Sequence, residues 1–235
     1  MSLPLLLIHG ANSAGRELAP LAEPLRAHTR VLTPDLPGHG GRELPEALSL
    51  PLYAEDLLRG LDAAGVERAV VGGYSIGGSA ALHLTRHHPE RVAGVLTLAS
   101  KFIFDRRAVE HLSHLTDPDR VARPGNPRHA ELLTLHQPQD WRAVILANQA
   151  LIRALGAGAA PTEADLRAIH APALVVSGTT DQVVPAAETV ALGKLLPQGR
   201  TLLFPGYAHP LGAVPIAALV PHIARWLSEL ETGAR

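Results

Sequence analysis

Cysteine is the first residue type that the sequence lacks. Without cysteine among its 235 residues, the chain has no disulfide, no thiolate metal ligand and no cysteine nucleophile. Aromatic residues are few, at 3%, which weighs against a large binding site of stacked rings. The formal net charge is only −1, so the composition indicates no surface for nucleic acid or an anionic membrane.

Long hydrophobic runs are missing as well. No apolar stretch approaches the roughly 18–20 residues that span a bilayer. The apolar start at residues 3–8 is short and follows no basic leader, so we interpret it as a strand and not as a signal peptide. The absence of cysteine is compatible with a reducing compartment. These features predict a cytoplasmic protein with no membrane or nucleic-acid partner.

What the chain does contain is a regular alternation of short apolar runs with amphipathic stretches. This alternation predicts a doubly wound, mainly parallel α/β sheet with about six strands. Several runs are almost continuously apolar, as in strands buried on both faces. The predicted strands are 3–9, 31–33, 69–72, 92–98, 173–177 and 201–204, and the predicted helices are 16–28, 53–64, 76–88, 186–195 and 216–230.

The alternation stops between residues 101 and 161. This segment of about sixty residues is far longer than an ordinary connection. Its short helical patterns predict helices at 107–115, 128–135 and 141–155, followed by a linker at 156–161. We therefore expect a core domain of residues 1–100 and 162–235, with a functional helical insertion at 101–161 before the strand at 173–177.

The turn after the third predicted strand is the most informative stretch. Its sequence Gly73-Tyr74-Ser75-Ile76-Gly77 fits G-x-S-x-G, which places a serine at the tip of a sharp strand-to-helix turn. Glycine on either side avoids collisions across so tight a turn. The first helical N–H, that of Ile76, is free to face a developing oxyanion. A glycine-rich turn with a capping serine is the simpler alternative, because the motif also arises by chance.

A serine hydroxyl needs a base to become nucleophilic, and the base needs an acid to orient it. Active groups of open α/β sheets gather at the carboxyl ends of the strands. Asp181 follows the strand at 173–177 and His209 follows the strand at 201–204, so both are expected at the edge that holds Ser75. The order Ser…Asp…His is typical of this elbow. We predict Ser75 as nucleophile, His209 as base and Asp181 as the orienting acid.

The sequence offers an alternative acid and also candidate metal ligands. Asp105, beyond the strand at 92–98, competes for the role of acid, and we favour Asp181 because its loop is short and turn-like. Some of the thirteen histidines, such as His83 and His87, have the spacing of metal ligands. They lack an H-E-x-x-H pattern and a third ligand nearby, so we predict no metal site.

Taken together, these motifs resemble the α/β-hydrolase family over nearly the whole chain. Among its members, the chain looks most like the small serine esterases and C–C-bond hydrolases. The resemblance implies an α/β-hydrolase fold and two-step acyl transfer without a cofactor. It is carried by His9-Gly10, Asp35-Leu36-Pro37-Gly38-His39-Gly40, the elbow with Gly78, Asp181 with Val184-Pro185, and His209-Pro210.

The resemblance also implies where the substrate lies. The backbone amides of Ala11 and Ile76 would form the oxyanion hole, and residues 101–161 would form a cap over the pocket. Basic residues near the cap, such as Lys101 and Arg128, are expected to be solvated surface charges, with an anionic substrate as the alternative. The expected substrate contacts are Asn12, Tyr74, Phe102, Trp141 and Val183.

The chain departs from the family pattern at two places. Family members commonly have two strands before the His-Gly strand, whereas only Met1 and Ser2 precede it here. The strand at 31–33 would then be an exposed edge, which a homodimer partner would cover. The elbow carries serine where epoxide hydrolases and haloalkane dehalogenases carry aspartate, and this argues against both reactions.

Three functions are compatible with these residues. The leading hypothesis is hydrolysis of a carboxylic ester or thioester of a small to medium acyl substrate. The same triad would also support cleavage of a C–C bond or acyl transfer to an acceptor other than water. The third hypothesis is a ligand-binding receptor that keeps the triad but has negligible turnover.

Overall fold

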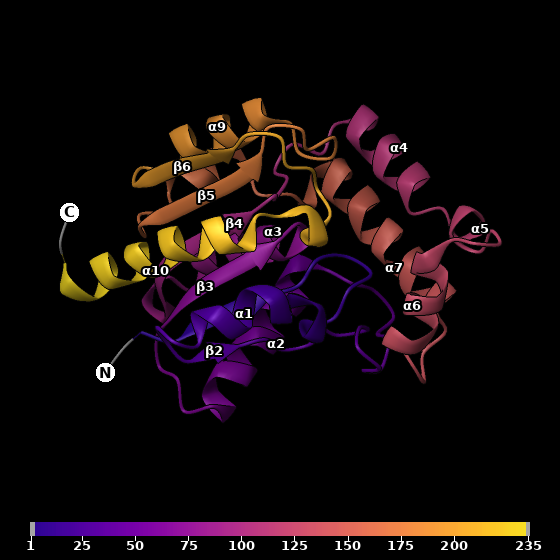
Figure 1. Cartoon of the computed structure of the whole chain (residues 1–235), viewed down its shortest axis with the longest axis horizontal. Coiled ribbons are helices and arrows are strands. Elements are labelled where there is room, and N and C mark those ends of the chain that lie inside the picture. The colour runs from indigo at the N-terminus through magenta and orange to yellow at the C-terminus, as the bar shows by residue number, and fades with distance from the viewer. Residues whose placement is uncertain (1–2, 234–235) are drawn as a thin grey trace.

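Six strands lie side by side in one sheet, in the order β2-β1-β3-β4-β5-β6 (Figure 1). This computed structural model describes residues 3–233. Every neighbouring pair is parallel, which confirms the predicted parallel sheet. The strands are β1 (Leu5–Ile8), β2 (Val31–Leu32), β3 (Ala69–Tyr74), β4 (Val92–Leu98), β5 (Ala173–Gly178) and β6 (Gly199–Phe204).

Helices cover both faces of the sheet because successive strand side chains point in opposite directions. In β1, Leu5 and Leu7 pack with α1 (Ala19–Leu25) and α10 (Ile216–Thr232). The alternate residues Leu6 and Ile8 belong to the core of the other face. That core includes residues of α2 (Leu50–Ala63), α3 (Ile76–His87), α8 (Glu163–Arg167) and α9 (Ala186–Leu195). Among residues 3–233, no helix is both long and apolar enough to cross a membrane.

Some boundaries differ from the prediction for local reasons. Helix α2 begins three residues early, since the Ser49 hydroxyl accepts a hydrogen bond from the Leu52 N–H at 3.2 Å and caps it. The predicted helix at 16–28 is a 3-10 turn, η1 (Gly15–Leu18), followed by the shorter α1. Further 3-10 turns are η2 (Pro89–Arg91) and η4 (Leu211–Ala213). Strand β2 has two residues and forms an edge of the sheet, as expected.

The predicted insertion is helical and lies beyond the carboxyl ends of the strands (Figure 1). We keep the name cap for residues 101–161. The linker predicted at 156–161 is wrong in part, because α7 (Trp141–Ala154) continues as a wide helical turn, η3 (Leu155–Ala159). Gly158 ends this turn with a φ of +109°. The helices of the cap are α4 (Arg106–Leu115), α5 (Pro118–Val121), α6 (Pro127–Leu135), α7 (Trp141–Ala154) and η3 (Leu155–Ala159).

The turn from β3 into α3 brings backbone close to backbone. A Cβ added at Gly73 would collide with the Gly77 carbonyl, and one added at Gly77 would collide with the carbonyl oxygen of Ile8 in β1. Ser75 itself has a φ of +54°, the left-handed region that non-glycine residues rarely adopt. Its N–H donates to the Leu98 carbonyl of β4 at 2.9 Å. The predicted need for glycine on both sides of the serine is confirmed.

Three buried histidines lie where the cap meets the core. The rings of His9 and His39 are 5.0 Å apart, and those of His39 and His136 are 5.8 Å apart. His9 accepts a hydrogen bond from the Leu36 N–H at 3.0 Å, and the Nε2 of His39 lies 2.9 Å from the Asn148 amide nitrogen of α7. Burial lowers the pKa of all three rings, to about 4 for His39. The fold therefore holds these imidazoles neutral near pH 7.

Two glycine substitutions, one in the elbow and one in α2, should have opposite effects on the free energy of unfolding. Gly73→Ala should lower the free energy of unfolding by at least about 2 kcal/mol, because the added methyl meets backbone that cannot retreat. Gly60→Ala, in the exposed interior of α2 where nothing lies within 4 Å, should raise it by up to about 1 kcal/mol. Urea unfolding measures both. Equal effects of the two substitutions would contradict this description of the elbow.

The histidine cluster predicts a loss of stability in acid. The pKa of His39 is lower in the folded than in the unfolded chain, so the unfolded chain binds more protons as the pH falls from 6.5 to about 4. The free energy of unfolding should drop across that range, by on the order of 3 kcal/mol for His39 alone. His39→Gln should flatten the drop, whereas His28→Gln, on an exposed residue, should not. If the free energy of unfolding fell equally with pH in wild type and His39→Gln, buried His39 would not be the cause of the loss of stability.

Candidate active site

Three loops at the carboxyl edge of the sheet carry the predicted triad. Ser75 follows β3, Asp181 follows β5 and His209 follows β6. The strands are parallel, so these loops emerge on the same side of the sheet. The predicted convergence of the three residues is thus a consequence of the topology.

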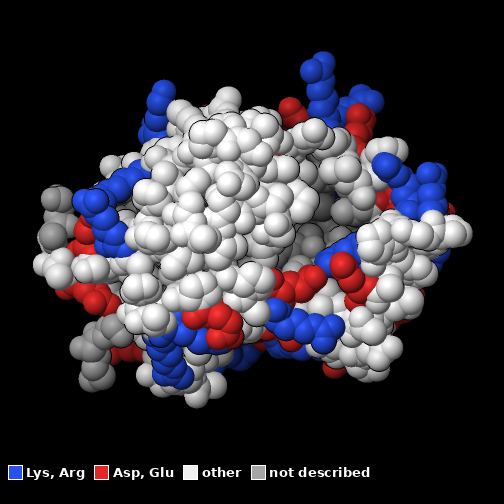
Figure 2. All heavy atoms as spheres, viewed as in Figure 1, with Lys and Arg blue, Asp and Glu red and all other residues white. Residues whose placement is uncertain are grey.

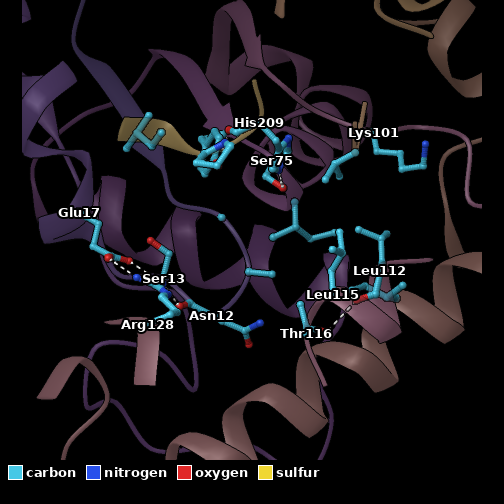
Figure 3. Close-up of a pocket in the computed structure, with 18 of the residues that line it drawn as sticks. Asn12, Ser13, Glu17, Ser75, Lys101, Leu112, Leu115, Thr116, Arg128 and His209 are labelled. Carbon is cyan, nitrogen blue, oxygen red and sulfur yellow. Dashed lines mark hydrogen bonds and ion pairs between the residues drawn. The ribbon is translucent and has the colours of Figure 1, made fainter. Parts of the chain in front are cut away.

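The three side chains form one hydrogen-bonded chain. The Nε2 of His209 lies 3.2 Å from the Ser75 hydroxyl, and its Nδ1 lies 2.9 Å from a carboxylate oxygen of Asp181 (Figure 3). The Asp181 side chain is 1% exposed and that of His209 is 17% exposed. A carboxylate on Nδ1 favours the tautomer with its proton there, which leaves Nε2 free to accept the serine proton.

Asp181 is held as a carboxylate by its neighbours. Burial alone would raise its pKa, but the hydrogen bond with His209 and the backbone N–H groups of Val183 and Val184 outweigh burial and lower it. Both amides donate to the second carboxylate oxygen at 2.8 Å. The competing acid, Asp105, instead caps α4 by accepting from the Ala108 N–H at 2.8 Å, and its side chain is exposed. The geometry therefore favours Asp181.

Tyr74 fixes the loop of the histidine. Its hydroxyl donates to the backbone carbonyl of His209 at 2.9 Å, and the two rings lie 5.4 Å apart. Burial raises the pKa of the phenol, which stays a neutral donor. The residue that precedes the elbow serine thus also positions the predicted base.

A cavity of about 870 Å³ opens at Ser75, between the core and the cap. Ala11 and Ile76, the predicted oxyanion residues, line it beside the serine. One side is mostly apolar, and Figure 3 shows Leu112 and Leu115 there; the other side is polar and includes Asn12, Glu17 and Arg128. In the space-filling view the surface is hollowed between core and cap, with acidic and basic side chains along one side of the hollow (Figure 2).

Three of the five predicted substrate contacts line this cavity and two do not. Asn12, Tyr74 and Val183 are part of its wall. Trp141 begins α7 and is buried in a small apolar cluster with Leu132, so it packs the cap together. Phe102 packs against the core on the face of the sheet that α2, α3, α8 and α9 cover. The prediction is therefore wrong for Trp141 and Phe102. Both side chains are used to pack the cap and do not reach the cavity.

Two basic residues that were expected to be solvated surface charges are paired with carboxylates. Lys101 pairs with Glu188 of α9 at 2.5 Å, and the two side chains are 12% and 6% exposed. Arg128 pairs with Glu17 at 2.7 Å across the junction of cap and core. Both pairs tie the cap to the core, a role that the sequence analysis missed because the partners lie far apart in the chain.

The histidine pairs with ligand-like spacing have other partners. The rings of His83 and His87 stack 4.1 Å apart on α3, and His87 Nδ1 lies 2.9 Å from the His83 carbonyl. Within residues 3–233, no group of three or more histidine, aspartate or glutamate side chains is placed to hold a metal ion.

Comparison with known proteins gives the chain a family. The sequence model of the alpha/beta hydrolase family matches residues 5–221. The chain is 28% identical over 235 residues to a pimeloyl-[acyl-carrier protein] methyl ester esterase of Edwardsiella ictaluri, covering 87% of this chain and 85% of that one. It is 30% identical over 220 residues to the esterase of the same name from Xylella fastidiosa strain M12, covering 85% and 84%.

Solved structures agree on the fold. A thermophilic esterase from Thermogutta terrifontis superposes with a TM-score of 0.79 at 24% identity, covering 98% of this chain and 91% of that one. A meta-cleavage product hydrolase from Pseudomonas fluorescens IP01 superposes with a TM-score of 0.74 at 20% identity, covering 99% and 92%. The matched family model and these folds lead to one conclusion: the chain belongs to the α/β-hydrolase family.

Proposed function

We propose that this protein is a serine hydrolase that cleaves a carboxylic ester or thioester of a small to medium acyl substrate. The observation that carries the proposal is the hydrogen-bonded chain from Ser75 through His209 to Asp181, which opens on a cavity large enough for such a substrate. The names of the two bacterial relatives, both methyl ester esterases, support the same reaction.

Acylation is the first half of the proposed reaction. The Ser75 oxygen attacks the carbonyl carbon while His209 Nε2 takes the hydroxyl proton. The carbonyl oxygen becomes an oxyanion, which the backbone N–H groups of Ala11 and Ile76 bind. Preorganised donors of this kind typically contribute about 3–4 kcal/mol each. As the C–O or C–S bond breaks, His209 returns the proton to the departing alcohol or thiol, and the acyl group stays on Ser75.

Deacylation repeats these steps with water. His209 removes a proton from water, the hydroxide attacks the acyl carbon, and the carboxylic acid leaves as Ser75 regains its proton. Asp181 stays ionised throughout, since its hydrogen bonds lower its pKa, and it stabilises the imidazolium. The reaction requires no cofactor.

The substrate class follows from the two sides of the cavity. We infer that an acyl chain lies along the apolar side, against Leu112 and Leu115, under the cap of residues 101–161. Methyl esters of medium acyl chains are the first substrates to test, given the relatives' names.

A cytoplasmic location and a homodimer contact at the β2 edge are part of the proposal.

Substitution of the triad tests the reaction. Ser75→Ala and His209→Ala should each lower kcat for a p-nitrophenyl ester by about 10⁴- to 10⁶-fold, and Asp181→Asn by about 10⁴-fold. The matched control is Asp105→Asn, the same change of carboxylate to amide on the helix cap, which should alter kcat less than about twofold because Asn also caps helices well. Crippled activity in Asp105→Asn with normal activity in Asp181→Asn would reverse the assignment of the acid.

The apolar side of the cavity is tested by filling it. Leu112→Trp should lower kcat/KM for a p-nitrophenyl octanoate at least about tenfold relative to the acetate, because a larger ring takes the space of the longer chain. Leu133→Trp, on an exposed face of α6 outside the cavity, is the control and should leave the ratio unchanged. An unchanged preference in Leu112→Trp would place the acyl chain elsewhere.

A further inference from the structure

We infer that Arg128 of the cap is a positioning residue that holds the oxyanion loop, residues 10–13, in its working conformation. The inference rests on the proposed function, since it concerns the hole that the Ala11 amide would form. It makes the cap a part of the catalytic geometry as well as a cover for the pocket.

The oxyanion loop has a conformation that needs support. It joins β1 to η1, and Asn12 within it has a φ of +54°. Asparagine tolerates this left-handed region better than most residues, but the conformation still has a cost. Ala11 directly precedes Asn12, and adjacent Cα atoms are fixed about 3.8 Å apart. A change in the backbone conformation of Asn12 would therefore displace Ala11 and its N–H.

Arg128, the second residue of α6, reaches this loop from the cap. Its guanidinium donates to the backbone carbonyl of Asn12 at 2.6 Å. The same group pairs with both carboxylate oxygens of Glu17 in η1, at 2.7 and 3.1 Å. The planar guanidinium of Arg128 thus joins the Asn12 carbonyl in the oxyanion loop to Glu17 in η1 (Figure 3).

Neighbouring contacts join α6 to the same segment. Arg16 of η1 donates to the Thr134 carbonyl at 3.1 Å. Just after α6, the Nδ1 of His136 accepts a hydrogen bond from the Gly40 N–H at 3.3 Å, which holds this end of the helix against the core. Residues 12–17 are therefore tied to the start of α6 by Arg128 and to its end by the contact between Arg16 and Thr134.

Direct recognition of an anionic substrate is the alternative role for Arg128. Two carboxylates already face its single charge, since Glu131 lies 2.9 Å from the same guanidinium as Glu17. An incoming anion would have to compete with both carboxylates for this guanidinium. The charges therefore favour a structural tie to the loop.

Arg128→Met removes the tie while keeping the apolar stem. For a neutral p-nitrophenyl ester we expect kcat to fall on the order of tenfold with KM within about twofold, because a displaced donor weakens the transition state more than the bound substrate. Arg128→Lys keeps the charge but not the fork, and should recover part of kcat. The control is Arg142→Met, which breaks another arginine ion pair of the cap, with Asp119 at 2.9 Å, and should leave kcat unchanged.

An aryl trifluoromethyl ketone separates positioning from general damage to the fold. The Ser75 oxygen adds to its carbonyl carbon, the serine proton passes to His209, and the resulting oxyanion occupies the hole. Its inhibition constant should rise on the order of tenfold in Arg128→Met, with the unfolding midpoint within about 2 °C of wild type. An unchanged kcat and inhibition constant would overturn the inference, as would a rise in KM confined to anionic esters. If wild type neither hydrolyses esters nor binds the ketone, the proposed function fails first.

Discussion

The site depends on one close approach, in which the backbone at the start of α3 lies directly against the ends of β3 and β1. Glycine at 73 and 77 permits this contact, because a methyl at either position would strike a carbonyl group. The hydrogen bond from Ser75 N–H to Leu98 then fixes the turn against β4. The serine is left at the tip of the turn in a strained backbone conformation, within reach of the histidine loop.

The charged residues around the cavity hold the cap in place. Lys101 and Glu188 join the start of the cap to α9 in a buried ion pair, and Glu188 also accepts from the Phe102 and Ile103 N–H groups at 2.8 Å. Arg128 joins α6 to the oxyanion loop. An unpaired buried charge is costly, so the buried Lys101–Glu188 pair holds the start of the cap firmly against α9.

The parallel sheet explains why the sequence alone could place Ser75, Asp181 and His209 at one edge. Each follows an apolar run, and parallel strands end at a common edge, so local pattern determined the place of all three. Phe102 and Trp141 were misplaced because apolar residues of a helical insertion carry no sign of which neighbour they cover. Lys101 and Arg128 find their partners 87 and 111 residues away. Only the packing of the cap on the core brings such pairs together.

The whole reaction depends on an activated Ser75, and covalent labelling detects such activation. Wild type and Ser75→Ala are incubated with a fluorophosphonate, and each is analysed by intact mass and peptide mapping. We expect one adduct in wild type, on Ser75, and none in Ser75→Ala. Folded wild type without an adduct, or an adduct that persists in Ser75→Ala, would contradict it and favour a ligand-binding role for the same cavity.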